Sequence, residues 1–554
     1  AQLGDGLPAE LVLSLPRATI DQACSARTVV LLSGDVREEL PVLYLRLREA
    51  ALEGGANLVE LAARATSLTR HAAVSLPVRP GDAPAIARAV TGDDAAAALL
   101  RSHPEGPAWP AEALTRAREL IGSGDTVVVV VGRPSLAEHE DVVAEAARIL
   151  AGALPGARFL TALRRGNVLG ALDMGLSPGL LPGRVSLEDG RDWFGARWGS
   201  VPRARGRGAA GVLTSLAGDG EDRVRALIAL GTDVSSDFPD RQLADRALSA
   251  GAFVVTVSGH PSPIVDRADV VLPAAVTHER PGTTTNIEGR LSRLGQKLVA
   301  PGQAWPDWMI ATELAAGLGG DLGVSGVADL WDEIERVAPA YAGATAAVLD
   351  SPAARDGVLV PFDPETGAGV PQPIDPIALP GVESVERQGA PPRVGLALGW
   401  LPAGGTTVEP EPGSAGGPTA PPTLDRAESG TGADPAPEVP AVDSYSLRLV
   451  ASRRLYDGGA AVGGSPSLAA LVPVALVRAN PYDLDRLGAT TGDRVRVRSA
   501  RGALELPAEA DAAVPRGVVA VDFNLPSPDG VANAAATLID ASAAVTEVRL
   551  ESVG

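Results

Sequence analysis

The sequence predicts an α/β protein with parallel sheets, followed by a small C-terminal β-barrel. Apolar runs of strand length alternate with amphipathic helical patterns in the first 350 residues, and segments of alternating polarity with turn residues fill the last hundred. A Pro/Gly-rich stretch separates the two patterns. We therefore expect an α/β region at 1–350, with room for two subdomains, a linker at 351–442 that is disordered mainly over 402–442, and a barrel at 443–554.

The first region opens with a strand, helix, strand pattern. Residues 27–32 form an apolar run closed by Ser-Gly, and the helix expected after them places Leu40, Leu43 and Leu47 on one stripe. Residues 57–61 then predict a second strand. A strand, helix, strand unit of this kind favours a parallel sheet.

The same pattern recurs along the chain, with strands expected at 126–131, 226–230, 253–257 and 270–272. Gly132 follows one of them, but it belongs to no GxGxxG fingerprint, which argues against a classical dinucleotide site there. We expect the strand ends to direct polar loops toward one rim of a doubly wound sheet.

A polar, glycine-bearing segment after the strand at 270–272 is the first candidate site. It offers the side chains of Glu279, Asn286, Glu288 and Arg290. In open α/β sheets ligands bind beyond the carboxyl ends of the strands, so such a loop can line a crevice. An ordinary surface loop has a similar composition.

The barrel region predicts strands at 446–450, 494–498, 503–506 and 518–521, joined by Gly-Asp and Arg-Gly turns. A short helix is expected near residues 480–487, starting at Asn480 or Pro481.

Composition excludes several function classes. The formal net charge of -20 and a pI near 4.8 argue against nucleic-acid binding. No apolar run approaches the roughly 20 residues that a bilayer span needs, so we expect no direct membrane span. Cys24 is the only cysteine, and the five histidines are scattered, so the chain lacks iron-sulfur and zinc-ligand spacing.

Blocks of residues in a consistent order resemble the molybdopterin oxidoreductase superfamily, which includes formate dehydrogenases. The stretch from Ala268 to Arg290 carries part of the likeness, and Asn167, Gly170 and the Asp-Met-Gly at 173–175 resemble the family's central domain. The barrel region resembles the molybdopterin dinucleotide-binding domain, a six-stranded double-psi barrel, through Asn480-Pro, Asp483, Gly492-Asp and Arg501-Gly.

Within that superfamily, residues 37–47 and 455–468 resemble the G subunit of NADH-quinone oxidoreductase (respiratory complex I), and the alanine- and arginine-rich composition with a single lysine, Lys297, suggests a GC-rich bacterium. The resemblance implies the C-terminal scaffold part of a large iron-sulfur subunit, in a complex that passes electrons from NADH to quinone in the respiratory chain. Its iron-sulfur clusters would lie in an N-terminal region absent here. The implied partners are the other peripheral-arm subunits, on the cytoplasmic side of the plasma membrane.

The resemblance also suggests where a pterin crevice would lie. Gly231-Thr-Asp occupies the place of a Gly-x-Asn-Pro loop that contacts the guanine dinucleotide in the family, and this departure, with no metal ligand in a recognisable context, implies a lost redox site. Candidates for the vestigial crevice are Gly231, Glu279, Asn286, Glu288, Arg290, Asn480 and Asp483. A structural role for these residues in loops and turns is the competing interpretation. No catalytic or metal-binding residue is expected, and Cys24 is the only sulfur that could ligate molybdenum.

Two other functions stay open. One is a truncated molybdopterin-dependent oxidoreductase of the formate dehydrogenase type, which molybdenum or tungsten analysis would reveal. The other is a stand-alone binding module that uses the acidic surface and the linker.

Overall fold

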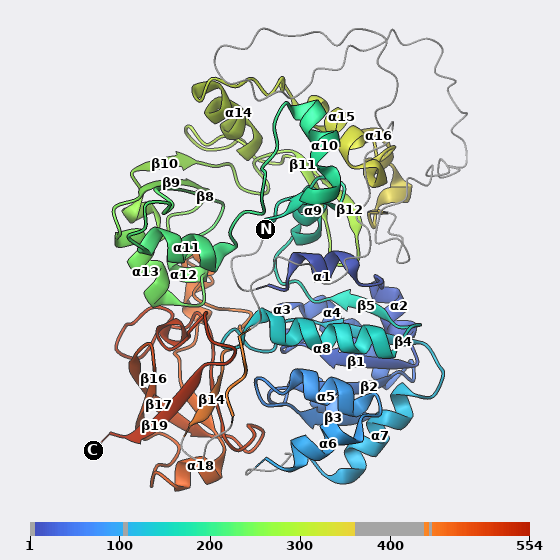
Figure 1. Ribbon diagram of the computed structural model, residues 1–554, viewed down its shortest axis with the longest axis vertical. Helices are drawn as coiled ribbons and strands as arrows, with labels where there is room; N and C mark the ends of the chain where they lie inside the picture. The colour runs from blue at the N-terminus through green and yellow to red at the C-terminus, as the bar shows by residue number, and fades with distance from the viewer. Residues whose placement is uncertain (1–5, 104–108, 361–436, 442–445, 554) are drawn as a thin grey trace. The chain divides into compact units, whose positions relative to one another are not determined.

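The computed structural model describes residues 6–103, 109–360, 437–441 and 446–553 (Figure 1). The chain divides into two compact units. The larger unit is built from residues 2–164, 209–271 and 430–554, and the smaller from residues 165–208 and 272–429. The expected bounds at 350 and 442 stay predictions, and the expected linker lies mostly outside the described residues.

A five-stranded parallel sheet forms the N-terminal part of the larger unit. Its order is β3-β2-β1-β4-β5. The strands are β1 (Thr28–Leu32), β2 (Asn57–Ala62), β3 (Val74–Pro77), β4 (Val127–Val131) and β5 (Arg158–Thr161). The central strands β1 and β4 are buried along their whole length, which explains their unbroken apolar sequences.

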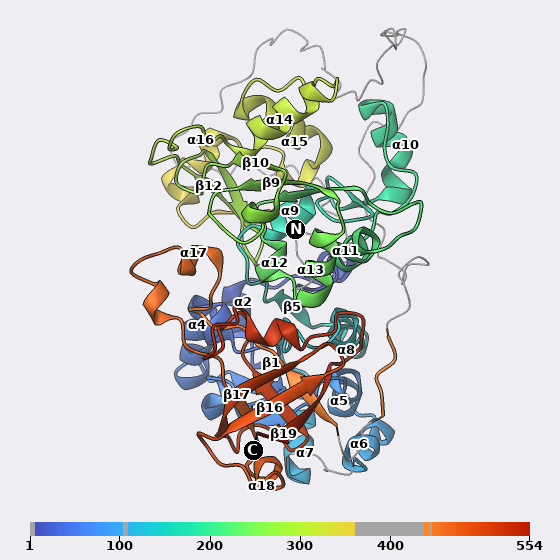
Figure 2. The same ribbon diagram turned by 90° about the vertical axis from the view of Figure 1, so that its left-hand side faces the viewer.

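Helices cover both faces of this first sheet. Figure 2 shows α2 (Ile20–Ser25) and α4 (Pro41–Leu52) on one side of β1, with α5 (Ala83–Val90) and α8 (Glu140–Ala153) on the other. Helix α4 starts with a proline, which needs no N–H partner in the first turn. It buries Leu43 and Leu47 as the leucine stripe predicts, whereas Leu40 is the residue before the helix and is only partly buried. Helix α7 (Ala111–Ile121) packs near β3.

A second parallel sheet belongs to the same unit, with the order β10-β9-β8. Its strands are β8 (Ala226–Leu230), β9 (Phe253–Ser258) and β10 (Val270–Pro273), where the chain passes to the smaller unit. Helices α11 (Ala209–Ala217), α12 (Val234–Asp237) and α13 (Arg241–Ser249) share one apolar core with β8 and β9. The prediction of a single rim is therefore wrong: the strand ends after Leu32 and Leu230 belong to two different sheets, because periodicity identifies strands without assigning them to a sheet.

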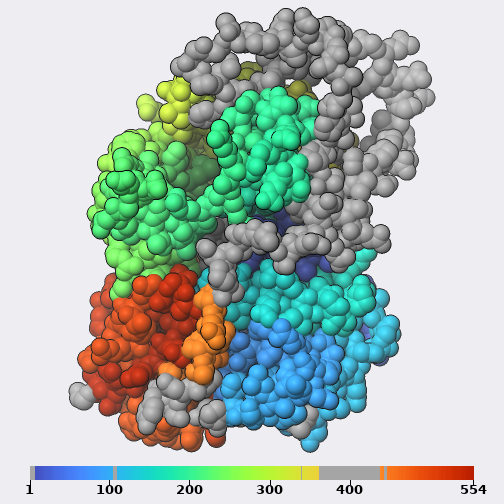
Figure 3. All heavy atoms as spheres, viewed as in Figure 1, coloured from blue at the N-terminus to red at the C-terminus, as the bar shows by residue number. Residues whose placement is uncertain are grey.

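The C-terminal region folds as a closed six-stranded barrel, as predicted, with the order β14-β18-β15-β17-β16-β19. The strands are β14 (Leu447–Val450), β15 (Val477–Ala479), β16 (Arg494–Ser499), β17 (Ala503–Ala510), β18 (Val518–Val521) and β19 (Glu547–Ser552). Two pairs, β14 with β18 and β15 with β17, run parallel. In Figure 3 the red and orange atoms of the barrel lie directly against the blue atoms of the first-sheet region.

The smaller unit contains an antiparallel sheet of β11 (Gly282–Thr285), β12 (Arg290–Leu294) and β13 (Val358–Leu359). Its longest helices are α10 (Leu187–Trp198), α14 (Asp307–Gly317) and α15 (Val327–Val337), and α9 (Val168–Asp173) packs on β11. The segment expected as one loop up to Arg290 is thus partly a β-hairpin, because its run of threonines favours strand. Among the described residues, no helix is both long and apolar enough to cross a membrane.

Candidate functional site

The loop candidates Asn286, Glu288 and Arg290 lie together in the turn of the β11–β12 hairpin. The side-chain oxygen of Asn286 accepts the N–H groups of Glu288 at 3.1 Å and Arg290 at 2.8 Å. The Arg290 Nε donates to Glu288 Oε1 at 2.7 Å, and Glu288 is 7% exposed. These side chains therefore satisfy one another and hold the turn.

Glu279 also makes a local contact. Its Oε2 accepts the N–H of Val276 at 3.0 Å, and its own N–H donates to the Val276 carbonyl at 2.8 Å. Both bonds close one turn after β10. The neighbouring His278 offers its carbonyl to the N–H groups of Lys297 and Leu298.

Gly231 ends β8 with a positive φ of 61°, which is the break that the sequence predicts at this position. Its N–H donates to the Val257 carbonyl at 2.8 Å. Asp233 then caps α12 by accepting the N–H of Ser235, so the Gly-Thr-Asp loop serves as a strand-to-helix turn.

Asn480 and Asp483 fix the short helix α18 (Pro481–Asp485). Asn480 caps it by accepting the N–H of Tyr482, and its Nδ2 donates to the Val514 carbonyl at 2.9 Å. Asp483 is 5% exposed and accepts the N–H of Gly517 at 3.0 Å. Together they join α18 to the segment that leads into β18.

The seven candidates thus form two local groups, the hairpin turn and α18, besides Gly231 and Glu279. Within the larger unit, α18 lies at the end of the barrel away from the second sheet in both ribbon views (Figures 1 and 2). The strand β8, which Gly231 follows, belongs to that second sheet and so lies apart from α18. That all seven line one crevice stays a prediction.

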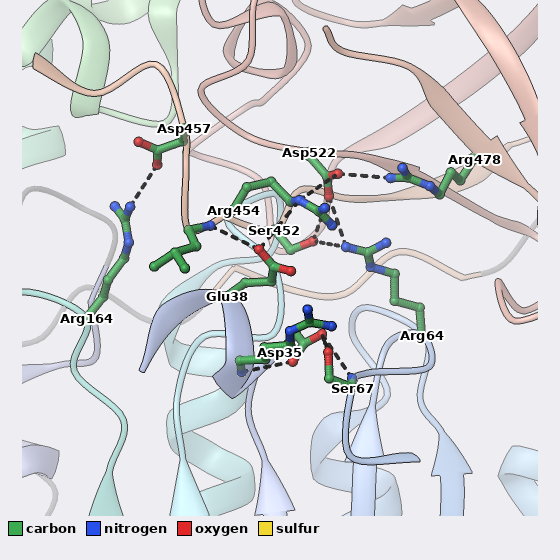
Figure 4. A network of polar contacts seen from close by, with 12 residues as sticks. Asp35, Glu38, Arg64, Ser67, Arg164, Ser452, Arg454, Asp457, Arg478 and Asp522 are labelled. Atoms are coloured by element: carbon green, nitrogen blue, oxygen red, sulfur yellow. Dashed lines mark hydrogen bonds and ion pairs between the residues drawn. The ribbon is translucent and has the colours of Figure 1, made fainter. Parts of the chain in front are cut away.

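A polar network that sequence reasoning missed lies at the carboxyl edge of the first sheet (Figure 4). Asp35 follows β1, caps the short helix α3 (Val36–Glu39), and accepts both the N–H and the hydroxyl of Ser67, at 3.0 and 2.8 Å. Arg64 follows β2 and donates to Ser452 Oγ and to Asp522 Oδ1, each at 2.9 Å. The barrel thereby contacts the sheet edge directly.

Asp522 is the centre of this network, which we call the edge network. Its side chain is 6% exposed and lies 2.9 Å from guanidinium nitrogens of both Arg64 and Arg478. Burial lowers the pKa of Arg478, but Asp522 and then Glu509 outweigh burial and raise it, so this guanidinium stays charged.

Three further ion pairs extend the edge network along the segment 452–457. Glu38 accepts the N–H of Leu455 at 3.0 Å and lies 3.6 Å from the Arg454 Nε. Asp457 is 3% exposed and pairs with Arg164 at 2.9 Å and with Arg453 at 3.3 Å. Residues 452–457 thus fill the place beyond the strand ends where open α/β sheets bind ligands.

The donor groups at hand do not fit a molybdenum ligand set. Burial raises the pKa of the Cys24 thiol, which lies in α2 and is half-buried, whereas the thiolate is the metal-binding form. Across the described parts of the chain, His, Cys, Asp and Glu side chains form no group of three that could hold a metal ion.

The smaller unit holds a buried charge cluster. Arg184 is 1% exposed and pairs with Asp173 through two bonds of 2.7 and 2.9 Å. The Tyr341 hydroxyl donates to Asp173 at 2.7 Å and lies 3.1 Å from the Thr285 hydroxyl. Burial, and then Asp173, raise the pKa of Tyr341, so the phenol stays protonated and acts as a donor. The cluster joins α9 to the hairpin.

Two family profiles match the chain. Molybdopterin oxidoreductase matches residues 187–317, and Molydopterin dinucleotide binding domain matches residues 447–548, the barrel. Among solved structures, acetylene hydratase from Pelobacter acetylenicus aligns with a TM-score of 0.59 at 14% identity, covering 98% of this chain and 80% of that one. This likeness shows the fold.

Curated relatives are oxidoreductase subunits. The G subunit of NADH-quinone oxidoreductase from Streptomyces coelicolor is 32% identical over 60% of this chain and 39% of its own length. The NADPH-Fe(3+) oxidoreductase subunit alpha of Geobacter sulfurreducens is 28% identical over 64% and 45%. The F420-dependent formate dehydrogenase subunit alpha of Methanocaldococcus jannaschii is 33% identical over 32% and 26%. The matches cover less than half of each relative. The chain has the molybdopterin oxidoreductase fold, its barrel matches the molybdopterin dinucleotide-binding domain, and its sequence is similar to the G subunit of NADH-quinone oxidoreductase.

Proposed function

We propose that this chain is a non-catalytic scaffold part of the large iron-sulfur subunit of an NADH-quinone oxidoreductase. The likeness to the G subunit of that enzyme supports the assignment. In this role the chain supports electron transfer from NADH to quinone, while iron-sulfur clusters held elsewhere in the subunit carry the electrons. Its own side chains supply stability and contact surface.

The edge network is the observation that carries the non-catalytic part of the proposal. At the carboxyl edge of the first sheet, Asp522, Glu38 and Asp457 already pair with arginines of the same chain. An anionic dinucleotide entering there would compete with these carboxylates for the arginines and would leave buried charges unpaired, which costs several kcal/mol per charge, on the order of 3–5. The turn contacts of Asn286, Glu288 and Arg290 support the same conclusion for the hairpin.

The proposed partners are the other peripheral-arm subunits, with the complex attached to the cytoplasmic side of the plasma membrane. The acidic net charge of -20 makes association through basic partner surfaces favourable. The whole complex, with this chain in it, would then be the enzyme.

Metal and pterin analysis tests the proposal. The protein is purified from cells grown with molybdate and tungstate, and its molybdenum, tungsten and oxidised pterin are quantified per chain. We expect amounts far below one per chain. Molybdenum or tungsten with a pterin at close to one per chain would refute the scaffold role and favour the formate dehydrogenase type, to which part of the chain is similar.

A second experiment tests the partners separately. A tagged copy expressed in its own cells is isolated under mild detergent, and the co-purifying proteins are identified. NADH dehydrogenase subunits in stoichiometric amounts are expected. Isolation of the protein as a free monomer would refute the assignment to this complex, whatever the metal analysis shows.

A further inference from the structure

The barrel and the first sheet also meet at a second place, around Arg448 on β14. This residue is 4% exposed, and its guanidinium donates to the carbonyls of Pro80 at 2.6 Å and Pro440 at 2.9 Å. It also lies 3.3 Å from Asp82 Oδ1. Arg448 thus ties the loop 78–82, which follows β3, to the segment 437–441, which precedes the barrel.

Gly81 shows how closely these segments pack. Its φ is 95°, and a Cβ at this position would lie 2.7 Å from Val439 Cγ1 and 3.2 Å from Val545 Cγ1. Both valines come from the barrel side of the contact. At Gly81 the loop 78–82 therefore has no space for a side chain toward the barrel.

Glu138 lies in the middle of this contact and is 4% exposed. Its carboxylate accepts the N–H of Gly81, and its backbone pairs with Val545 in an isolated antiparallel bridge. Arg133 donates to the carbonyl of Glu138 at 2.6 Å. We call Glu138, Arg448, the loop 78–82 and the segment 437–441 the Glu138 joint.

Charged groups reach the Glu138 joint from every element packed there. The loop 78–82 brings Arg79 and Asp82, and His103 lies 3.5 Å from Asp82. Arg133 precedes α8, and its guanidinium lies 3.4 Å from the carboxylate of Glu140, the first residue of α8. Arg448 comes from β14. Burial raises the pKa of Glu138 to about 7, against the lowering effects of the Gly81 N–H, Arg133 and Arg448, while Asp82 raises it further.

We propose that Glu138 makes the contact between barrel and first sheet sensitive to pH near neutrality. The protonated, neutral carboxyl stays buried against Gly81 and the joint stays closed. When the proton leaves to solvent, a second negative charge appears beside Asp82 and competes with it for Arg448. The loop 78–82 and the segment 437–441 then separate more often.

Hydrogen exchange tests this proposal directly. A carboxyl whose pKa rises on folding stabilises the closed state fully below its ordinary value of 4.5, and this stabilisation is lost as pH rises through about 7. Exchange of a peptide covering 78–84 is followed by mass spectrometry from pH 5 to 8.5, with times scaled for the intrinsic pH dependence. The opening equilibrium should rise on the order of a hundredfold across this range.

Two variants make the test specific. Glu138→Gln keeps an acceptor for the Gly81 N–H but cannot ionise, so its opening should not change with pH. Glu145→Gln lies in α8, the helix that follows Glu138, and its side chain is half-exposed and paired with Arg88, so this variant should keep the parent profile. A parent protein without pH dependence, or a Glu138→Gln protein with the parent's profile, would overturn the proposal.

Asp82→Asn provides a third variant in case Glu138→Gln does not fold. Removing this charge lowers the pKa of Glu138, so the midpoint of opening should move to lower pH. A midpoint that does not move would contradict the assignment of the transition to Glu138.

Discussion

At the scale of single residues, the buried pair of Asp173 and Arg184 shows what the sequence can and cannot predict. The family resemblance marks the region of Asp173, but no local pattern predicts that Arg184 is buried, because arginine is mostly a surface residue. Its partners come from α9 and from Tyr341, more than 150 residues away along the chain. Only the folded chain reveals that this arginine is neutralised.

The first prediction concerns this pair. Asp173→Asn leaves the Arg184 guanidinium buried without its counter-charge, and we expect a loss of about 3–5 kcal/mol in the free energy of unfolding. Chemical denaturation monitored by tryptophan fluorescence measures it. Glu333→Gln is the control, because Glu333 pairs with the more exposed Arg336, and it should cost less than about 1 kcal/mol. If both variants lower the free energy of unfolding equally, the buried pair contributes no more to stability than the exposed pair.

The second prediction concerns Gly81. Gly81→Ala introduces a Cβ both at an unfavourable φ and within 2.7 Å of Val439. We expect it to lower the free energy of unfolding by more than about 2 kcal/mol. Gly92→Ala is a matched control, since Gly92 has a φ of 111° but nothing within 4 Å of the added Cβ. The thermal midpoints of the two variants separate backbone strain from the steric contact. If Gly92→Ala destabilises the protein as much as Gly81→Ala does, the steric contact between the loop 78–82 and Val439 adds nothing to the loss of stability.

At the scale of elements, the strands that the sequence predicts are those with long apolar or strictly alternating patterns. Strands β1, β4, β8 and β16 fall within a residue or so of the expected positions. The missed strands, such as β3 and β15, have three or four residues each and carry polar residues, so they form because neighbouring strands offer free backbone groups. Short strands of this kind depend on tertiary context more than on their own sequence.

The β11–β12 turn gives the third prediction. If Asn286 holds the turn, Asn286→Ala removes an acceptor for two N–H groups and should lower the free energy of unfolding by about 1–3 kcal/mol. The exposed Gln296→Ala, which loses one side-chain bond to the Leu298 carbonyl, should change it by less than about 0.5 kcal/mol. Asn286→Ala protein with unchanged stability would favour a ligand-contacting role for this residue.

At the scale of the whole molecule, the predicted order of α/β region, linker and barrel omits how the larger unit is assembled. Residues 209–271 group with the barrel and the first sheet, although the linker and the smaller unit interrupt the chain between them. Contacts such as Arg501 with Asp240, at 2.9 Å, fasten this segment to the barrel.

The edge network was not predicted from the sequence for the same reason. Asp35 and Arg64 follow strands and could be marked as crevice residues, but the barrel partners of Arg64, Ser452 and Asp522, are hundreds of residues away and follow no sequence pattern.

A substitution of Asp522 tests whether the edge network holds the barrel against the first sheet. Asp522→Asn preserves shape and leaves Arg64 and Arg478, whose side chains are only 16% and 19% exposed, without their shared carboxylate. We expect the free energy of unfolding to fall by about 3 kcal/mol or more. Proteases should also cleave the segments at the contact between barrel and sheet faster. Asp529→Asn removes a carboxylate that is 57% exposed and pairs with Arg494 on the same barrel, and it should cost less than about 1 kcal/mol. The Arg64→Met variant combined with Asp522→Asn should cost less than the sum of the two single changes, because the two residues share one interaction. Additive losses would mean that Arg64 and Asp522 act independently, and that the bond between them does not hold the barrel against the sheet.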